Sequence, residues 1–470
     1  MSSFILVYPN IILKGIYKDI IKGVAVPPQG ICQIAAILRQ KGHQVKLIDA
    51  LVEALSANEV AERITHNSPD FVGFSSTTMQ IDSAHKIAEE VKKKLPQVKT
   101  LIGGPHVSAL PEETMKRLSF FDYGFIGESE HTIIEFVDAF SNGKQFENVT
   151  GLVYKENETI KVNPKRKFIE NLDKLPLPAW DLLPNLAENY QQSVARVDHV
   201  PAASVTTSRG CPCKCIFCAR NVYGISYRGH SDQYVIKMIE FLIDHYGMKS
   251  ISFEDENFTA NKKRLRAICE RVTEKKYDLT WSCVGRIDMV NEESLRIMKK
   301  AGCTSISYGI ESGSQRILDI LGKKLRVEKI REGIKNTSKA GIRARGYFII
   351  GNPAETFESI KETEKIIMGL PFSEVQISFM TPFPGTDLYD TATEYGEFNN
   401  DWAELNIWTP NFIPKGLNKE ILIAEEKRIM RKFYFRPKAI AMYLQRALSH
   451  RYFFKYFKDG FTILKFLLKK

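Results

Sequence analysis

The chain has 470 residues, of which 44% are hydrophobic and 26% charged, and its formal net charge is +11 at pH 7. This length is enough for about three domains, and the apolar fraction excludes a fibrous or largely disordered chain. Residues 427–470 carry thirteen Lys or Arg and one acid, a net charge of +12, so residues 1–426 sum to about −1. A nucleic-acid groove in the body of the chain is therefore not expected.

Export and membrane insertion are not expected either. The apolar stretch at residues 4–8 is too short for a signal peptide and lacks a basic segment before it, and no apolar run has the length of a membrane span. Four cysteines stand singly in apolar surroundings: Cys32, Cys269, Cys283 and Cys303. Such cysteines are typical of buried thiols, and we predict a cytoplasmic protein in a reducing environment.

Residues 1–140 alternate between strand and helix patterns. Short buried strands are predicted at residues 4–8, 44–49, 70–76, 98–103 and 122–126. Amphipathic helices separate them, such as the one with Ile31, Ile34 and Leu38 on one face. Five such units predict a flavodoxin-like (Rossmann-type) α/β domain, which is an open parallel sheet with helices on both faces.

Three loops at the predicted carboxyl ends of these strands are rich in small residues. They are Ser75-Ser76-Thr77-Thr78, Gly103-Gly104-Pro105-His106 and Gly127-Glu128-Ser129-Glu130. Ligands of open α/β sheets bind at this edge, and small residues let the backbone approach a bulky ligand closely. No G-x-G-x-x-G follows the first strand, which disfavours a dinucleotide.

A second alternating region predicts a partial barrel. Its expected strands are residues 203–207, 250–254, 280–283, 304–309, 343–350 and 374–380. Six βα units are fewer than the eight of a closed barrel, so we predict an open (β/α)6 barrel with its site at the carboxyl strand ends. The domains are then 1–140, 201–390 and a mostly helical 391–470. Residues 141–200 are a linker with one hairpin (151–154 and 160–163) and a proline-punctuated connector.

The loop after the first barrel strand carries three cysteines with C-x3-C-x2-C spacing. Cys211, Cys215 and Cys218 supply soft thiolates, enough to hold three irons of a [4Fe-4S] cluster and leave the fourth iron open. A zinc site would need a fourth ligand, and the chain has no second C-x2-C or H-x3-H motif. Cys213 is too close to its neighbours for tetrahedral geometry, and we treat it as a bystander.

This motif, with Phe217 directly before the last cysteine, resembles the signature of the radical S-adenosylmethionine (SAM) superfamily. The resemblance implies that the open iron chelates SAM, and that one electron passed to the sulfonium yields a radical able to take hydrogen from a saturated carbon. It also implies SAM contacts at Phe217, Glu254, Arg286, Glu311 and Gly351, of which the arginine fork suits a carboxylate. Each charged residue among them has a plainer alternative, as a structural ion pair.

The N-terminal region resembles the cobalamin-binding domain that precedes many radical SAM enzymes. The matching segments are residues 27–30 (Pro-Pro-Gln-Gly) and the three small-residue loops. The resemblance implies cobalamin contacts at Ser75, Ser76, Thr77, Gly103, Gly104, Pro105, His106, Gly127 and Glu128. The D-x-H-x-x-G motif that supplies an axial histidine in cobalamin mutases is absent, which implies a corrin without a histidine below the cobalt. A nucleotide-binding flavodoxin-like module is the alternative, and His106 could be an ordinary polar loop residue.

Residues 433–470 interleave aromatic and basic side chains. Such a segment suits peripheral contact with an anionic membrane, here the inner face, or a helix that packs its aromatic side chains on the barrel. Tails of this type resemble those of cobalamin-dependent enzymes that act on tetrapyrroles or lipids. That resemblance favours a hydrophobic substrate.

These resemblances imply a cobalamin-dependent radical SAM enzyme with three cofactors: a [4Fe-4S] cluster, SAM and cobalamin. The favoured reaction is methylation of an unactivated carbon in a lipid-like, tetrapyrrole-like or natural-product substrate, with a flavodoxin- or ferredoxin-type electron donor. One alternative is radical cyclisation, as in the anaerobic magnesium-protoporphyrin ester cyclase. Another is a sensor that holds cobalamin without catalysis. S-adenosylhomocysteine is released by methylation and is not required by cyclisation.

Overall fold

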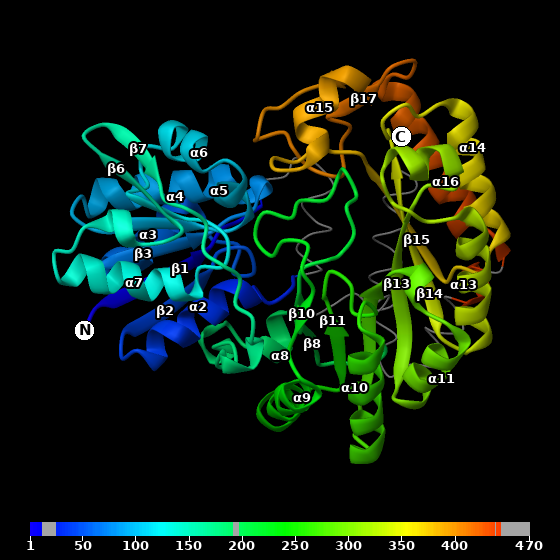
Figure 1. Cartoon of the computed structure of the whole chain (residues 1–470), viewed down its shortest axis with the longest axis horizontal. Coiled ribbons are helices and arrows are strands. Elements are labelled where there is room, and N and C mark those ends of the chain that lie inside the picture. Colours follow the sequence, from blue (N-terminus) through cyan, green and yellow to red (C-terminus); the bar gives the residue numbers. More distant parts are fainter. Residues whose placement is uncertain (12–24, 191–196, 438, 443–470) are drawn as a thin grey trace.

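The computed structural model describes residues 1–11, 25–190, 197–437 and 439–442. Two α/β units lie side by side, and a C-terminal segment with α15 (Asp387–Tyr395) and β17 (Phe412–Pro414) lies above the gap between them (Figure 1). The two units correspond to the two alternating regions predicted from the sequence.

The N-terminal unit contains a seven-stranded sheet in the order β2-β1-β3-β4-β5-β6-β7. Its strands are β1 (Ser3–Tyr8), β2 (Gln44–Asp49), β3 (Phe71–Ser75), β4 (Lys99–Gly103), β5 (Tyr123–Phe125), β6 (Leu152–Glu156) and β7 (Thr159–Val162). The first five are parallel, and β6 and β7 add an antiparallel hairpin. The predicted strands and hairpin are confirmed, and the hairpin extends the N-terminal sheet.

Helices cover both faces of this sheet. They are α2 (Gln29–Gln40), α3 (Ala57–Thr65), α4 (Ile81–Lys94), α5 (Pro105–Ala109), α6 (Pro111–Arg117) and α7 (Glu130–Ser141). Ile5 and Val7 of β1 pack in the core with α3 and α4, whereas Phe4 and Leu6 pack in the opposite core with α2 and α7. Because both faces are buried, the strand is apolar at every one of these positions.

The second unit is an open barrel of six parallel strands in the order β8-β11-β12-β13-β14-β15. They are β8 (Ala202–Val205), β11 (Ser250–Phe253), β12 (Thr280–Gly285), β13 (Cys303–Glu311), β14 (Arg343–Ile350) and β15 (Glu374–Phe379). The main helices of the barrel are α9 (Asp232–Tyr246), α10 (Lys262–Lys275), α11 (Glu292–Lys300), α12 (Gln315–Ile320), α13 (Val327–Lys339) and α14 (Phe357–Gly369). Because β8 and β15 are not paired with each other, the predicted partial barrel is confirmed.

The barrel strands are apolar toward the helices and polar on the opposite, concave face. In β11, Ile251 and Phe253 belong to the main core, whereas the alternate residues are serines. The Ser282 hydroxyl of β12 donates to the Ser252 hydroxyl (3.1 Å). Since side chains alternate along a strand, hydroxyl groups line the inside of the barrel.

The segment between the units runs along the N-terminal sheet before it enters the barrel. Gln33 of α2 donates to the Pro176 carbonyl (2.9 Å), and the Tyr190 hydroxyl donates to the buried Asp49 carboxylate (2.7 Å). These contacts tie the connector to the N-terminal unit.

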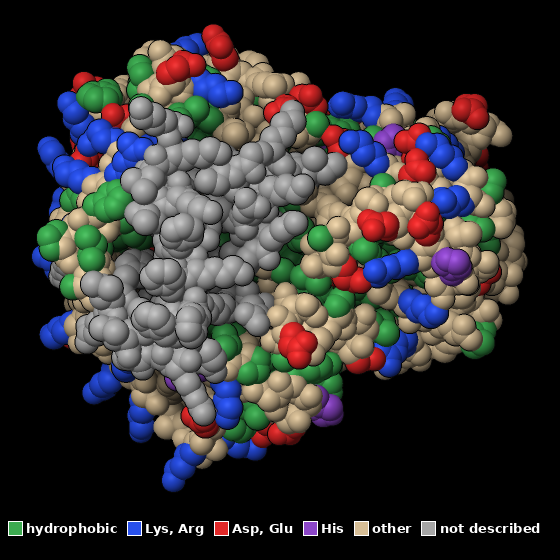
Figure 2. All heavy atoms as spheres, turned by 180° about the vertical axis from the view of Figure 1, so that it is seen from behind, with side chains coloured by type: hydrophobic (Ala, Val, Ile, Leu, Met, Phe, Trp, Pro, Cys, Tyr) green, Lys and Arg blue, Asp and Glu red, His purple; other side chains and the backbone are tan. Residues whose placement is uncertain are grey.

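The C-terminal segment contains an antiparallel pair, β16 (Gly396–Phe398) with β17, followed by α16 (Lys419–Tyr434). No helix in the described ranges is long and apolar enough to cross a membrane. The aromatic and basic segment predicted at residues 433–470 lies mostly outside the described residues. On the rear face, acidic and basic side chains of the described part are interspersed (Figure 2).

Candidate active site

The cysteine loop connects β9 (Ser208–Arg209) to β10 (Arg228–Gly229), beyond the carboxyl end of β8. It carries Cys211, which is half-buried, Cys215, which is buried, and Cys218, which is exposed. The Ile216 amide donates to the Leu321 carbonyl (3.1 Å), and the Leu388 amide donates to the Ile216 carbonyl (2.9 Å). The loop is therefore held between the end of α12 and the start of α15.

Two cations, Arg286 and Lys323, act electrostatically on the cysteine loop. Burial raises the pKa of Cys215, whereas Lys323 opposes this shift. Arg286 also lowers the pKa of Cys215. Positive charge near a thiol favours the thiolate, which is the form that ligates metals.

The donor set fits a cluster better than a single metal ion. In the described part of the chain, no three His, Cys, Asp or Glu side chains are arranged to hold one ion. Cys211 is hydrogen-bonded to Cys213, and this bond lowers the pKa of Cys213 to about 6. A [4Fe-4S] cluster binds each thiolate at a different iron, so its ligands are spread more widely than those of one ion. Three soft thiols on one loop with cations beside them meet that requirement.

A buried ion pair, Glu311 with Lys323, lies beside the cysteine loop. The Lys323 Nζ is 2.6 Å from the Glu311 carboxylate, and the two side chains are 8% and 9% exposed. The same Nζ lies 5.9 Å from the centre of the Phe217 ring. Glu311 has a φ of +68°, a strained value for a residue other than glycine and one that clusters at functional sites. Lys323 escaped the sequence analysis because nothing local distinguishes it from its exposed neighbour Lys324.

Arg286 and Glu254, both predicted SAM contacts, also lie on the carboxyl side of the barrel. The Arg286 guanidinium donates to both Asp288 oxygens (3.0 and 2.9 Å) and to the Lys323 carbonyl (2.9 Å). The Glu254 carboxylate accepts from the Ser252 hydroxyl (2.7 Å). The Arg286 fork is thus shaped for a carboxylate, and Asp288 occupies it.

Gly351, predicted to approach adenine, has a φ of +80°. Its amide and that of Asn352 donate to the buried Glu355 carboxylate (2.5 and 3.0 Å). Burial raises the pKa of Glu355 to about 7. A Cβ at position 351 would lie 3.3 Å from Leu422 of α16. Glu355 braces this loop and was not singled out from the sequence, where it reads as an ordinary loop acid.

Two adjoining cavities open at the carboxyl edge of the N-terminal sheet. The larger, about 220 Å³, is lined from the N-terminal unit by Gly30, Ile34, Ser75, Gly104, Pro105, Gly127, Glu128, Ser129 and Glu130. From the barrel unit it is lined by Ala219, Asn221, Val222, Tyr223 and Glu256. The smaller, about 90 Å³, enters the sheet between residues that include Leu6, Phe74, Leu101, Gly103 and Phe125. The larger cavity therefore joins the predicted cobalamin loops to the residues that directly follow Cys218.

Glycines in the cavity walls let the backbone of two loops approach a ligand closely. Gly104 has a φ of +106°, and a Cβ there would lie 2.7 Å from the Ser76 carbonyl, so only glycine lets the two loops meet. A Cβ on Gly127 would meet nothing within 4 Å, which places that loop against open space. The Asn221 side-chain nitrogen is buried against Gly385 without a hydrogen-bond partner among the described residues.

His106, a predicted cobalamin contact, is buried away from both cavities. Its ring is 1% exposed, lies edge-on against Trp402 (4.3 Å), and has Nδ1 3.0 Å from the Thr78 hydroxyl. Burial, with a smaller effect of Arg117, lowers the pKa of His106 to about 3, so the ring is neutral. His106 does not line either cavity. Its contact with Trp402 lies between the N-terminal unit and the C-terminal segment.

Three further predicted cobalamin residues have other partners in the structure. Ser76 is buried, and the amide and the hydroxyl of Thr77 both donate to the Gln80 side-chain oxygen (3.2 and 2.9 Å). Neither lines a cavity. Glu128 lines the larger cavity, but its carboxylate accepts hydrogen bonds from Arg209 and Arg228. Their role as direct cobalamin contacts stays a prediction.

Two family models match this arrangement in chain order. The B12 binding domain matches residues 23–137, and the radical SAM superfamily matches residues 205–367. The uncharacterized methyltransferase PH0819 of Pyrococcus horikoshii is 36% identical over 424 residues, which cover 89% of this chain and 90% of that protein. An anaerobic magnesium-protoporphyrin IX monomethyl ester cyclase of Rubrivivax gelatinosus is 27% identical over 424 residues, or 89% of this chain and 75% of the cyclase.

Solved structures share the fold. The cobalamin-dependent SAM radical enzyme OxsB, with aqua-cobalamin and SAM bound, has a TM-score of 0.75 at 19% identity and covers 96% of this chain and 72% of its own. The radical SAM methyltransferase TsrM from Kitasatospora setae has a TM-score of 0.71 at 16% identity and covers 93% and 90%. The chain belongs to the cobalamin-binding radical SAM family. The predicted fold class, enzyme class and three cofactors are confirmed, whereas the individual ligand residues and domain limits remain predictions.

Proposed function

We propose that this chain transfers a methyl group to an unactivated carbon of a small-molecule substrate. The observation that carries the proposal is the shared cavity, whose walls come from the cobalamin loops on one side and from the continuation of the cysteine loop on the other. One cavity that borders both the cobalamin loops and the residues after Cys218 suits a reaction that uses both cofactors.

When bound, the cluster and SAM supply a radical able to remove hydrogen from a saturated carbon, and cobalamin supplies the methyl group. We assign Cys211, Cys215 and Cys218 to three irons. Arg286 is suited to the SAM carboxylate after exchange with Asp288, and its neighbour Lys323 adds positive charge. Burial of these groups excludes water and strengthens their electrostatic interactions.

Polar groups dominate the concave face of the barrel. Arg345 donates to Glu374 (2.9 Å) and to the Ser307 hydroxyl (3.2 Å). These polar side chains extend the polar face that begins with the serine hydroxyls of β11 and β12. We propose that the part of the substrate that enters the barrel carries hydrogen-bonding groups, since an apolar group there would exclude water from hydroxyl groups that have further hydrogen-bonding capacity. The hydrophobic substrate predicted from residues 433–470 depends on a segment mostly outside the described ranges.

Cyclisation is the second candidate, because the relatives include cyclases over most of this chain. The two reactions differ in the fate of SAM. Methylation yields S-adenosylhomocysteine together with 5′-deoxyadenosine, whereas cyclisation does not require S-adenosylhomocysteine.

The test is anaerobic reconstitution with iron, sulfide and hydroxocobalamin, followed by incubation with SAM and titanium(III) citrate. We expect an iron–sulfur absorption shoulder with corrin bands, and both SAM products by mass spectrometry. Formation of 5′-deoxyadenosine without any S-adenosylhomocysteine would favour the cyclase, and absence of both would refute an enzymatic role.

Two partners are proposed on chemical grounds. Reduction of the cluster calls for a one-electron donor of the flavodoxin or ferredoxin type, and an oxygen-labile cluster suits the cytoplasm. The basic, aromatic segment is proposed to contact an anionic membrane surface. Sedimentation with phosphatidylglycerol vesicles, compared with phosphatidylcholine vesicles, tests the second proposal, and equal binding to both would contradict it.

A further inference from the structure

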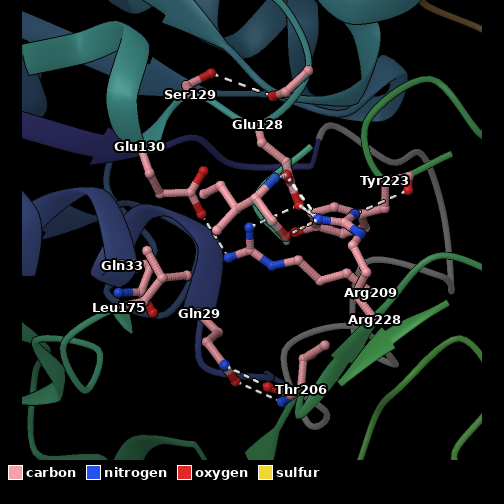
Figure 3. Close-up of polar contacts among 12 residues, drawn as sticks. Gln29, Gln33, Glu128, Ser129, Glu130, Leu175, Thr206, Arg209, Tyr223 and Arg228 are labelled. Atoms are coloured by element: carbon pink, nitrogen blue, oxygen red, sulfur yellow. Dashed lines mark hydrogen bonds and ion pairs between the residues drawn. The ribbon is translucent and has the colours of Figure 1, made fainter. Parts of the chain in front are cut away.

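Two carboxylates of the N-terminal unit and two guanidinium groups of the barrel unit form a buried network (Figure 3). Arg209 donates to Glu128 (3.0 Å) and to Glu130 (2.5 Å), and Arg228 donates to both oxygens of Glu128 (2.8 and 2.9 Å). The four side chains are between 1% and 11% exposed. Two negative and two positive charges thus neutralise one another away from water.

Each side of this network belongs to a cofactor loop. Glu128 lies in the loop after β5, Glu130 is the first residue of α7, and both line the larger cavity. Arg209 stands two residues before Cys211 on β9, and Arg228 is its direct pairing partner on β10. The network therefore joins a wall of the cobalamin cavity to the stem of the cysteine loop through side chains alone.

Aromatic side chains cover the two guanidinium groups. The Arg209 guanidinium lies 5.2 Å from the centre of the Tyr223 ring, and that of Arg228 lies 4.7 Å from the centre of the Phe168 ring. Such cation–π contacts favour a fixed orientation of the guanidinium plane. Tyr223 also lines the larger cavity, so the cover of the network is itself part of the cavity wall.

A second contact fixes the same stem. The Gln29 side-chain nitrogen (Nε2) donates to the Thr206 carbonyl (2.8 Å), and the backbone amide of Thr206 donates to the Gln29 side-chain oxygen (2.6 Å; Figure 3). Gln29 is the first residue of α2, and the next residue, Gly30, lines both cavities. The stem before Cys211 is thus attached to the N-terminal unit at two points.

A buried network of this kind is suited to fix the relative orientation of the two units, and it contributes little to the net folding stability. Desolvation offsets much of the attraction in a buried ion pair, so such pairs contribute little net stability, whereas paired forks accept only one geometry. An exposed pair between α2 and the connector, Arg39 with Asp181, has side chains 44% and 53% exposed and imposes no such geometry.

We propose that Arg209 and Arg228 are positioning residues that fix the cobalamin-binding domain against the cysteine loop and so set the separation between SAM and cobalamin. The proposal rests on the function proposed above. Transfer of the SAM methyl group to cobalamin depends on the network, because it bridges the two units. Reductive cleavage of SAM does not depend on it, because that step occurs within the barrel unit.

The test measures both SAM products without substrate, using the full chain loaded with iron, sulfide and hydroxocobalamin and reduced by titanium(III) citrate. Methyl transfer breaks the C–S bond with its electron pair left on sulfur, takes two electrons from the reduced cobalamin, and releases S-adenosylhomocysteine. Abortive cleavage is measured as 5′-deoxyadenosine. For Arg209→Gln we expect at least a tenfold drop in S-adenosylhomocysteine, with 5′-deoxyadenosine within threefold of the unmodified chain.

Arg39→Gln is the matched control. It removes another arginine that pairs the N-terminal unit with a different segment, the connector, and it should leave both products unchanged. Arg228→Gln should reproduce the effect of Arg209→Gln, and Arg209→Lys, which keeps the charge but not the fork, should fall between. Iron and cobalamin contents show that the variants are loaded. If Arg209→Gln does not fold, Arg209→Lys takes its place in the comparison.

A readout independent of turnover is the magnetic coupling between the reduced cluster and divalent cobalamin. We expect its splitting or broadening in the paramagnetic resonance spectrum to weaken in Arg209→Gln and to persist in Arg39→Gln. Equal loss of both products in a fully loaded variant, or an unchanged product ratio with unchanged coupling, would overturn the inference. Absence of both products in the unmodified chain would instead count against the proposed function.

Discussion

The two units place their predicted ligand sites at the same location, the carboxyl edge of a parallel sheet, but build them from different materials. In the N-terminal unit most residues that line the cavity are small, such as Ser75, Gly104 and Gly127, and its carboxylates are neutralised by arginines of the barrel unit. In the barrel unit it consists of thiols and paired charges, such as Cys215 and the Glu311–Lys323 pair.

This contrast separates two ways to bind a cofactor. A large, largely preformed molecule needs space and close backbone approach, which glycine provides by omitting Cβ. A reactive metal centre needs side chains that ligate it and charges that stabilise it, and titratable side chains provide both. The N-terminal site should therefore be sensitive to added volume, and the barrel site to removed charge or sulfur.

The largest effect is expected from loss of a barrel ligand. Cys215→Ala removes one of three iron ligands, so the iron–sulfur absorption shoulder and 5′-deoxyadenosine formation should fall below detection. The matched control is Cys213→Ala, which lies between two motif cysteines and should retain the shoulder and cleavage activity. A shoulder that survives Cys215→Ala, or that is lost in Cys213→Ala, would contradict the assignment of the ligands.

The next largest effect, on folding stability, is expected from removal of the buried Lys323 ammonium group. Lys323→Met leaves the Glu311 carboxylate buried without its partner, so the free energy of unfolding should fall by about 3–5 kcal/mol. The double variant Lys323→Met/Glu311→Gln should recover part of this loss, because no uncompensated charge remains. Urea unfolding measures both changes.

The control for this pair is an exposed one. Lys329 and Glu332 lie 2.7 Å apart with side chains 59% and 56% exposed. Lys329→Met should change the free energy of unfolding by less than about 0.5 kcal/mol. A similar loss in both variants would mean that the Glu311–Lys323 pair is not special.

An added methyl group tests the N-terminal site. Gly104→Ala combines an unfavourable positive φ with a contact of 2.7 Å to the Ser76 carbonyl, and it should cost about 3 kcal/mol in unfolding free energy. It should also lower cobalamin retention after gel filtration. Gly42→Ala is the control, because Gly42 has a φ of +83° but open space around its Cβ position, and it should cost only about 1 kcal/mol without affecting cobalamin.

The smallest predicted effect is a pH dependence at the contact with the C-terminal segment. The pKa of His106 is lowered to about 3, so the unfolded chain binds a proton between about pH 6.5 and 3 that the folded chain does not. Its contribution to stability is complete above pH 6.5 and declines as the pH falls, by at most about 1.4 kcal/mol per pH unit.

His106→Gln should remove this decline, which amounts to about 2 kcal/mol between pH 7 and pH 5. Urea unfolding at the two pH values measures it. The control is His131→Gln, at an exposed position, which should leave the decline intact. An unchanged decline in His106→Gln would show that the acid sensitivity arises elsewhere.

Local patterns in the chain were enough to predict most of the fold. The strands at residues 44–49 and 343–350 were predicted with their observed bounds, because each is a run of buried or alternating residues between turn signals. The hairpin was predicted, but not its addition to the N-terminal sheet, since strand order depends on contacts between segments far apart in the chain.

Side-chain partners were harder to predict than elements. His106 and Glu128 stand in loops of the expected composition, yet the structure packs the first against Trp402 and pairs the second with Arg209. Lys323 and Glu355 carry no local signal at all. For His106, Glu128 and Lys323 the partner comes from a different element of the fold, so composition and spacing near the residue contain no information about it. Glu355 is paired within its own loop, and only its burial depends on the rest of the fold.

The sequence by itself indicated the cofactors, because the C-x3-C-x2-C motif and the small-residue loops, each within a single stretch of the chain, resemble those of a known family. Only the tertiary structure decided which side chains share a cavity, which charges neutralise one another, and how the cysteine loop is attached to the N-terminal unit. The physical reason is that burial and ion pairing depend on the distance between segments in space, which is set by packing of the two units and is not written in any single stretch of the chain.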